Sequence, residues 1–290
     1  MRIVAWNIEN LARWLDDGAA LAAQVEALGA PDVLCLQEVR LRPRDGLAVA
    51  AARALLPGYR CALALCDDPR NVTFRGGRAY GVATYVHERC GELATATPAW
   101  DREGRVLVTA LAAHRLAIVN LYAVNGTAKP YVDPATGEPR GDRHAHKRRF
   151  QDAVFALGAE LRAGAQVVLI GDWNVSRAAI DVTPRLRTEE PHATARAQLD
   201  DHLARGGWRD VFRDHHPGAR GYTWFGKTRG GRLDAARVDY ALVDAALAPR
   251  VTRAVILDEP RLRPRSDHAP IAIELAAARR GGDPPIASAG

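Results

Sequence analysis

Short apolar runs recur along the chain and alternate with longer segments in which apolar residues return every three or four positions. The runs predict β-strands over residues 2–6, 32–37, 59–65, 80–86, 105–111, 115–121, 166–170, 238–243, 251–257 and 270–275. The helical spacing predicts helices over residues 18–29, 46–56, 146–163 and 195–205. Strands and helices that alternate in this way are typical of an α/β domain.

Long loops are predicted between some of these elements, over residues 67–78, 124–142 and 213–236. In the second of them, Pro130, Pro134 and Pro139 leave no room for a regular element. No linker divides the chain, so residues 1–277 are expected to form a single catalytic domain. The tail over residues 278–290 is expected to be disordered, because it begins with charged residues, glycines and prolines.

The composition narrows the class of protein. Hydrophobic residues make up 48% of the 290 positions and charged residues 26%, which is ordinary for a globular domain and excludes a disordered chain. No apolar run reaches the ~18 residues of a membrane span, and the N-terminus reads as a strand rather than a signal peptide. The cysteines at 35, 61, 66 and 90 form no CxxC pair. We therefore expect a cytoplasmic protein that binds no membrane, with a monomer as the default state.

The net charge of +6 suits an anionic partner, of which nucleic acid is the commonest. However, only Lys129, Lys147 and Lys227 of the 40 basic residues are lysines, and the rest are arginines. A GC-rich genome produces this bias without any selection for binding. Charge alone therefore leaves the partner open.

Polar side chains stand at the ends of several apolar runs. The run from Ile3 ends in Asn7, and the run from Val33 ends in Gln37 and Glu38. The later runs are flanked in the same way, by Asn120, Tyr122 and Asn125, by Asp172 and Asn174, by Asp239, and by Asp267 and His268. If these strands share sheets, their polar ends converge at one rim.

Such convergence would bring four carboxylates together, those of Glu38, Asp172, Asp239 and Asp267. Like charges at close range repel and raise each other's pKa, and a divalent cation relieves that repulsion. Oxygen ligands without cysteine favour Mg²⁺ or Mn²⁺ over Zn²⁺. The set therefore predicts metal-assisted attack on a phosphoester.

The segments that carry these residues resemble the endonuclease/exonuclease/phosphatase superfamily, in particular its exonuclease III-type AP endonuclease branch. The matching segments are Trp6-Asn7-Ile8, Leu36-Gln37-Glu38, Tyr80-Gly81-Val82-Ala83, Asn120-Leu121-Tyr122, Gly171-Asp172-Trp173-Asn174, Tyr222-Thr223-Trp224-Phe225, Arg237-Val238-Asp239-Tyr240 and Ser266-Asp267-His268-Ala269-Pro270. They follow the family order across residues 2–275. The resemblance implies a DNase I-like α/β fold, in which two packed β-sheets are flanked by helices in a four-layer sandwich.

The resemblance also implies roles for the residues at the strand ends. Glu38 is expected to be the main ligand of Mg²⁺ or Mn²⁺, with Asn7 and Asp267 near the metal directly or through water. Asp172 is expected to orient or deprotonate the attacking water. The remaining roles concern the phosphate: Asn174 holds it and the water, His268 contacts it as an imidazolium paired with Asp239, and Tyr122 and Asn125 bind it. Taken alone, each residue also fits a structural role, such as a turn cap at Asn7.

Further residues are predicted to contact the substrate, with an alternative in each case. Trp224 corresponds to the wall of the branch's abasic-sugar pocket, and otherwise packs in the core beneath a loop. Arg237 is assigned to substrate binding, and otherwise forms a surface ion pair with Asp239. Lys147, in a basic stretch at a helix start, either contacts phosphate or lies on a solvated helix face. The basic loop 75–78 is likewise either a DNA contact or a solvated loop.

Two residues depart from the branch pattern. Glu9 stands where relatives carry a shorter polar residue, and Ala236 is small where some relatives place a large apolar wall residue. The proline-rich loop 124–142 is also longer than expected beside Tyr122 and Asn125, so it could reshape access to the site. A wider pocket at Ala236 would weaken selectivity for abasic sites.

Together with these patterns, the resemblance implies a nucleoid-associated, Mg²⁺-dependent DNA repair phosphodiesterase of exonuclease III type. It would cleave double-stranded DNA 5′ to abasic sites, process 3′ ends as a 3′–5′ exonuclease or 3′-phosphatase, or do both. A second hypothesis keeps the chemistry but places it on RNA or on a phosphoester outside nucleic acids. A third hypothesis is a binding protein that has lost catalysis, against which the complete set of site residues argues.

Overall fold

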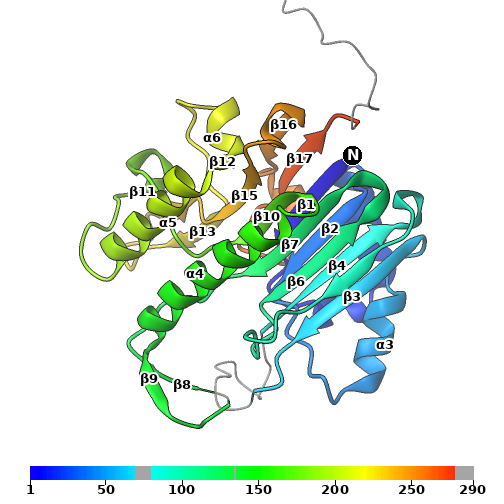
Figure 1. Ribbon diagram of the computed structural model, residues 1–290, viewed down its shortest axis with the longest axis horizontal. Helices are drawn as coiled ribbons and strands as arrows, with labels where there is room; N and C mark the ends of the chain where they lie inside the picture. The colour runs from blue at the N-terminus through cyan, green and yellow to red at the C-terminus, as the bar shows by residue number, and fades with distance from the viewer. Residues whose placement is uncertain (69–79, 134, 278–290) are drawn as a thin grey trace, which may run out of the picture.

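Two six-stranded β-sheets form the centre of the computed structural model, which describes residues 1–68, 80–133 and 135–277 (Figure 1). The first sheet has the order β16 (Val251–Ile256), β17 (Ile271–Leu275), β1 (Arg2–Asn7), β2 (Val33–Gln37), β4 (Gly81–His87) and β3 (Tyr59–Leu65). The second has the order β12 (Trp208–Asp210), β15 (Asp239–Asp244), β10 (Gln166–Asp172), β7 (Leu116–Tyr122), β6 (Val106–Leu111) and β5 (Ala94–Ala96). In the centre of each sheet a parallel pair, β1 with β2 and β10 with β7, lies beside antiparallel neighbours.

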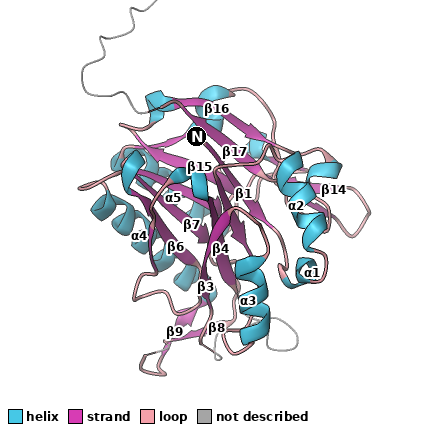
Figure 2. Cartoon of the chain, turned by 90° about the vertical axis from the view of Figure 1, so that its right-hand side faces the viewer, coloured by secondary structure: helices cyan, strands magenta, loops and turns pink. Residues whose placement is uncertain are grey.

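Helices cover the outer faces of both sheets, which makes four layers (Figure 2). The first sheet is covered by α1 (Ala12–Leu15), α2 (Gly18–Ala27) and α3 (Gly46–Ala54), and the second by α4 (Arg143–Leu161) and α5 (His192–Gly206). A further helix, α6 (Val211–His215), lies beside β15 and β16. The predicted α/β sandwich of two packed sheets is confirmed. No helix among the described residues is both long and apolar enough to cross a bilayer.

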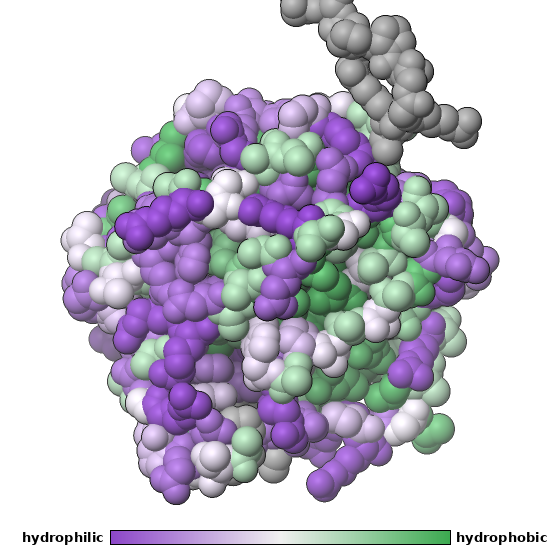
Figure 3. Space-filling model, viewed as in Figure 1, coloured by the Kyte–Doolittle hydropathy of each residue, from purple (hydrophilic) through white to green (hydrophobic). Residues whose placement is uncertain are grey.

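Strand alternation builds a separate apolar core on each face of the sheets. Ile3 and Ala5 of β1 pack between the sheets against Val168 and Ile170 of β10. Val4, which lies between Ile3 and Ala5 in β1, faces outward and packs under the helices of the first sheet. On the other side, α4 contributes buried aromatic and aliphatic residues to the outer core of the second sheet. Hydrophilic side chains predominate on the surface over α4 and α5 (Figure 3), as expected for helices that bury one face.

The same alternation places a polar layer at one end of the core between the sheets. We use this name for Asn7, Gln37, Asn120, Asp172 and Asp239, which follow the inward-facing apolar residues of β1, β2, β7 and β10 or open β15. All five are buried. Bonds across the layer join the two sheets: Gln37 Nε2 donates to Asn120 Oδ1 at 2.7 Å, and Asn120 Nδ2 donates to the carbonyl oxygen of Ala83 at 2.9 Å.

The predicted helices and strands are present with boundaries shifted by up to three residues, but two of the predicted loops contain strands. Residues 124–142 include a hairpin of β8 (Pro130–Val132) and β9 (Pro139–Asp142), so the prediction that prolines exclude regular structure there is wrong. Prolines are tolerated at strand starts and edges, where no ladder hydrogen bond is lost. Residues 213–236 include the hairpin of β13 (Trp224–Lys227) and β14 (Leu233–Ala236), which β11 (Val182–Thr183) extends to a small sheet. Short 3-10 turns lie at Glu88–Cys90, Ala112–His114, Ala179–Asp181, Ala248–Arg250 and Pro260–Leu262.

Two smaller predictions concern the cysteines and the tail. All four cysteines are free thiols, and Cys35 lies in the core between the sheets as predicted. Burial raises the pKa of the Cys35 thiol to about 12, so this group is an inert apolar side chain at neutral pH. The predicted disordered tail over 278–290 lies outside the described residues.

The polar layer gives a first prediction about stability. Replacing Asn120 with alanine should lower the free energy of unfolding by about 1–3 kcal/mol, because the amide of Gln37 and the carbonyl of Ala83 lose buried partners. Urea unfolding would measure the change. Thr95→Ala on the exposed edge strand β5 should change stability by less than about 0.5 kcal/mol. Equal stabilities of the two variants would contradict a structural role for the layer.

Candidate active site

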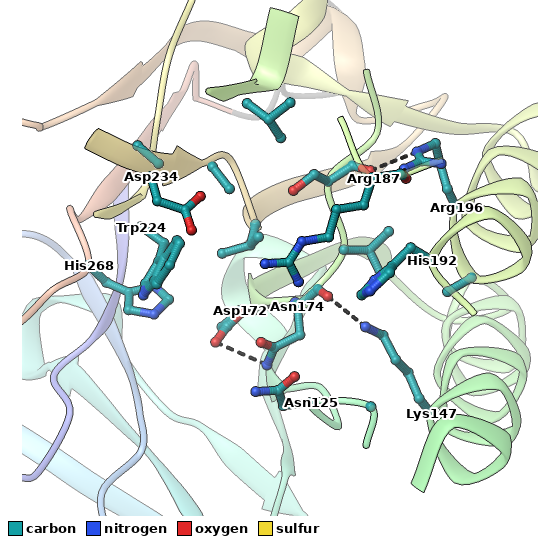
Figure 4. A pocket seen from close by; sticks show the side chains of 18 of the residues that line it. Asn125, Lys147, Asp172, Asn174, Arg187, His192, Arg196, Trp224, Asp234 and His268 are labelled. Atoms are coloured by element: carbon teal, nitrogen blue, oxygen red, sulfur yellow. Dashed lines mark hydrogen bonds between the residues drawn. The ribbon is translucent and has the colours of Figure 1, made fainter. Parts of the chain in front are cut away.

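A cleft of about 410 Å³ opens where the polar layer reaches the surface. Its floor holds Asp172, Asn174 and His268, and its walls come from α4, α5, the loop before α5 and the β13–β14 hairpin. Figure 4 shows Lys147, His192 and Arg187 on one side of the cleft, and Trp224 and Asp234 on the other. The cleft therefore has a basic wall, an acidic floor and an aromatic wall.

Asp172 and Asn174 occupy the end of β10 because of two backbone conformations. Gly171 has φ +140°, and a side chain there would place its Cβ within 2.0 Å of the Leu121 carbonyl oxygen, so glycine is required before Asp172. Asn174 adopts the left-handed region with φ +54°, which asparagine tolerates. Its backbone N–H donates to Asp172 Oδ1 at 2.8 Å, and its Nδ2 donates to the Ala123 carbonyl at 2.9 Å and to Asp172 Oδ2 at 3.2 Å.

Asp172 has the pKa expected of a general base. Burial raises its pKa to about 7, and the carboxylates of Asp239 and Glu38 act in the same direction against the opposing charge of His268. A carboxylate with a pKa near neutrality is a far stronger base than an exposed one and is still ionised in a large part of the molecules at pH 7.

His268 is fixed as a cation by its neighbours. Its Nδ1 lies 2.9 Å from Asp239 Oδ2. Burial alone would lower the pKa of His268, but the carboxylates of Asp239, Asp172 and Asp267 raise it to about 10. The backbone is fixed as well, since Trp6 Nε1 donates to the carbonyl of His268 at 3.1 Å. At neutral pH His268 is therefore an imidazolium that presents Nε2 to the cleft.

Asn7 is fully buried and connects the two sheets next to the floor of the cleft. Its Nδ2 donates to Glu38 Oε1 and to Asp172 Oδ2, both at 3.1 Å, and lies 3.5 Å from His268 Nε2. Its Oδ1 accepts from the backbone N–H of Glu9 at 3.0 Å. Asn7 is thus both the turn cap considered from the sequence and a part of the site.

Neither predicted carboxylate ligand of the metal, Glu38 or Asp267, belongs to the group of side chains that could share one ion. Among the described residues, three side chains lie close enough to share one ion, with ligand atoms within 4.8 Å of one another: Asp172, Asp239 and His268. Glu38 is joined to this group through Asn7 and pairs with Arg40. Asp267 is half exposed and accepts from Trp224 Nε1 at 2.8 Å. The roles of Glu38, Asn7 and Asp267 at a metal stay predictions.

Tyr122 is held as a neutral phenol at the edge of the floor, where Asn125 also lines the cleft. Burial and the carboxylates of Glu38 and Asp172 raise the pKa of Tyr122 well above its ordinary value. Tyr122 is thus a hydrogen-bond donor at all working pH values.

A buried network behind Tyr122 went unrecognised in the sequence. Glu103 accepts hydrogen bonds from Arg105 and from both Nη atoms of Arg143. The guanidinium of Arg105 lies over the rings of Tyr80 and Tyr122, 3.6 and 4.8 Å from their centroids. An arginine that opens an apolar strand two residues after a glutamate was the available signal, since such a charge needs a buried partner.

Lys147 belongs to the site and not to a solvated helix face. It is 6% exposed, and its Nζ donates to the carbonyl of Asn174 at 2.6 Å. Burial lowers its pKa to about 8. The helix begins three residues earlier than predicted, with Asp142 as its N-cap. Lys147 therefore lies in the second turn of the helix, and its side chain lines the cleft.

The prediction that Arg237 binds substrate is wrong, and so is its alternative of a surface pair with Asp239. Arg237 is 1% exposed, and its guanidinium donates to both carboxylate oxygens of Asp181 and of Asp210. Asp239 pairs with His268 instead. Arg237 therefore anchors the base of β14 to the body of the protein.

Trp224, Ala236 and Glu9 line the cleft, so Trp224 is not a core residue beneath a loop. The basic loop 75–78 lies outside the described residues. Arg187, His192 and Asp234 line the cleft without having been predicted, because nothing in the local sequence distinguishes them from ordinary surface residues.

Comparison with known proteins identifies the class. The sequence model of the Endonuclease/Exonuclease/phosphatase family matches residues 4–268, so the chain belongs to this family. The predicted superfamily is thereby confirmed.

The chain is also similar to particular proteins of known name. The chain is 27% identical over 238 residues to a DNA-(apurinic or apyrimidinic site) endonuclease of Dictyostelium discoideum. The aligned region covers 80% of this chain but only 58% of that longer protein. A 3′-5′ exonuclease from Neisseria meningitidis has 26% identity and a TM-score of 0.69, with 95% of this chain and 99% of that chain covered. An AP endonuclease from Leishmania major shares the fold, with a TM-score of 0.71 at 23% identity over 94% of this chain and 86% of that chain.

The reassignment of Arg237 can be tested by substitution. Arg237→Ala should lower the free energy of unfolding by about 3–5 kcal/mol, because Asp181 and Asp210 lose the cation that compensates them in the interior. Arg237→Lys should cost less and give a folded enzyme whose KM for substrate is unchanged. Chemical denaturation and steady-state kinetics would measure the two effects. A raised KM at full stability would restore the substrate-binding role.

Proposed function

We propose that the protein is a Mg²⁺-dependent DNA phosphodiesterase that cleaves 5′ to abasic sites and processes 3′ ends. The single observation that carries the proposal is the pairing on the cleft floor of a carboxylate base, Asp172, with a fixed imidazolium, His268. A base and a charged donor close together are what in-line displacement at a phosphate requires. The basic wall with Lys147 and Arg187 supplies the positive charge that a polyanion needs.

In this mechanism the phosphate lies over the floor of the cleft. Asp172 takes the proton of the attacking water while Asn174, whose amide is bound to Asp172, holds that water in line. His268 donates from Nε2 to a phosphate oxygen, with Asp239 holding its ring. Tyr122 and Lys147 add a phenol donor and a nearby positive charge. Most of the rate enhancement then comes from positioned charge, since these groups are ordered before the substrate binds.

The donor set on the floor fits a hard divalent cation. Glu38 and Asp172 both accept from the amide nitrogen of Asn7, and the group of side chains close enough to share one ion among the described residues contains no cysteine. Carboxylate oxygens of this kind select Mg²⁺ or Mn²⁺. Glu38 and Asn7 would hold the ion, with Asp267 as a further oxygen ligand at the rim. When bound, the ion would neutralise charge on the phosphate and on the leaving oxygen.

The named relatives support the choice of substrate. The Dictyostelium relative is named for cleavage at apurinic or apyrimidinic sites, and the Neisseria meningitidis structure for 3′-5′ exonuclease activity. A second Neisseria structure, with 25% identity and a TM-score of 0.70 over 95% of this chain and 99% of that chain, is titled a 3′ phosphatase bound to a product DNA hairpin. These names favour double-stranded DNA with an abasic site or a damaged 3′ end as the substrate, and a monomer would suffice.

The experiment that tests this function is a cleavage assay in Mg²⁺ and in EDTA. The end-labelled duplexes would carry one abasic site, a recessed intact 3′ end, or a 3′-phosphate. Cleavage at the abasic site or at the 3′ end that is lost in EDTA is the expected result. A protein that acts on none of the three duplexes would contradict the proposal.

Asp172→Asn should lower kcat by about 10²–10⁴-fold, the usual contribution of a general base. DNA affinity should stay the same or rise, because the side-chain shape is kept and one negative charge is lost. Single-turnover cleavage and fluorescence anisotropy would separate the two effects. Near-normal turnover would remove Asp172 from the role of base.

Glu38→Gln should raise the Mg²⁺ concentration for half-maximal activity by at least about tenfold, while leaving DNA affinity nearly unchanged. A Mg²⁺ titration at saturating DNA would measure the shift. Glu274→Gln, on β17 at the opposite end of β1, is the matched control and should not alter the titration. An unshifted curve for Glu38→Gln would exclude it as a ligand.

A further inference from the structure

The β13–β14 hairpin presents three side chains to the cleft on one face. Trp224 pairs with Ala236 and Gly226 pairs with Asp234 in the antiparallel register. Paired residues point to the same side, and so do residues two apart along a strand. Trp224, Ala236 and Asp234 consequently line the same wall, and Figure 4 shows Asp234 next to Trp224 on this side of the cleft.

The indole of Trp224 is a fixed part of this wall. A Cβ added to Gly226 would lie 2.6 Å from the indole ring, so the ring packs directly over the glycine. At its other end, Trp224 Nε1 donates to Asp267 Oδ2 at 2.8 Å. Ala236, which is paired with Trp224, is small and adds little bulk beside the indole. The wall is thus rigid and apolar except for one carboxylate.

That carboxylate differs from the other acids of the cleft. Asp172 and Glu38 accept hydrogen bonds from Asn7, and Asp267 accepts one from Trp224. Asp234 has no side-chain hydrogen bond or ion pair to any residue in the part of the chain that the structure describes. Its side chain is only partly exposed, so the carboxylate is partly desolvated without a compensating hydrogen bond from the described residues. Such a group is suited to a ligand atom.

Charge decides what that ligand atom is. A phosphate next to Asp234 would be repelled, whereas a neutral hydroxyl would donate a strong charge-assisted hydrogen bond. With a phosphate over His268 and Asp172, the group next to it against the indole is a sugar. An internal deoxyribose has no free hydroxyl, but an abasic sugar has one at C1′ and a ribose has one at C2′. We propose that Asp234 accepts a hydrogen bond from a free sugar hydroxyl and is a specificity-determining residue, an inference that rests on the proposed phosphodiesterase function.

Two matched substrate pairs test this inference. One pair is a duplex with a natural abasic site and the same duplex with a tetrahydrofuran, which lacks the C1′ hydroxyl. The other is a 3′-terminal ribonucleotide and a 3′-terminal deoxyribonucleotide, which differ in the C2′ hydroxyl. Wild-type protein should prefer the hydroxyl-bearing member of at least one pair by about tenfold in kcat/KM, as for a hydrogen bond to a charged group. The preferred pair identifies which hydroxyl is bound.

Asp234→Ala should bring that preference to about one by slowing only the hydroxyl-bearing substrate, because removing a single hydrogen bond affects only the substrate that makes it. Asp234→Asn should keep a weaker preference. Asp201→Asn, which removes the same charge from the exposed face of α5, is the control and should leave the preference intact.

The outcomes separate the inference from the function on which it rests. An unchanged preference in Asp234→Ala, or an equal loss on both members of a pair, would overturn the role of Asp234 while the wild-type activity still supports the proposed function. A wild-type protein that cleaves DNA but prefers neither hydroxyl-bearing substrate would also overturn the role of Asp234 and leave the proposed function standing. A wild-type protein that cleaves no DNA would overturn both.

Discussion

The site depends on one geometric constraint, the alternation of side chains along a β-strand between two faces. Because Ile3 and Ala5 face the opposing sheet, Asn7 must face it too, and Asp172 follows Ile170 inward in the same way. The amide of Asn7 therefore meets the carboxylate of Asp172 at 3.1 Å across the gap between the sheets. A register slip of one residue would turn these groups toward the helices, so the packing of the apolar core also holds the chemistry in place.

Burial then determines the charges of the groups that alternation brings together. Asp172 and Asp239 share a desolvated space with His268, and the imidazolium lies where it offsets both carboxylates. Behind the floor, the buried carboxylate of Glu103 offsets the positive charges of Arg105 and Arg143. Each of these charges has a partner, so the donors and acceptors are oriented before any substrate arrives. Preorganisation of this kind is what makes fixed dipoles and charges effective in stabilising a transition state.

The strand ends could be predicted from the sequence because they depend on local patterns. An apolar run that ends in Asn7 or Asp172 specifies both the strand and the face of its last residue. The side-chain positions of Lys147 and Arg237 could not be predicted from such local patterns. Two interpretations were open for Lys147, a phosphate contact or a solvated helix face, and it lies buried at the cleft, where it donates to the carbonyl of Asn174. Arg237 was assigned to substrate and is bound by two aspartates distant in sequence. The side-chain position of a basic residue is determined by its tertiary partners, which no short motif records.

In the β13–β14 hairpin, different residues anchor the strands and line the cleft. At its base, Arg237 is held by Asp181 and Asp210, and its backbone N–H donates to the carbonyl of Asp181. This anchoring fixes the orientation of the strand without using any side chain that faces the cleft. Trp224 and Asp234 are consequently free to change with the substrate, while the floor, which is anchored in both sheets, keeps its chemistry. The anchored base also keeps the backbone that carries Asp234 in place, which favours discrimination between a substrate that offers a donor and one that does not.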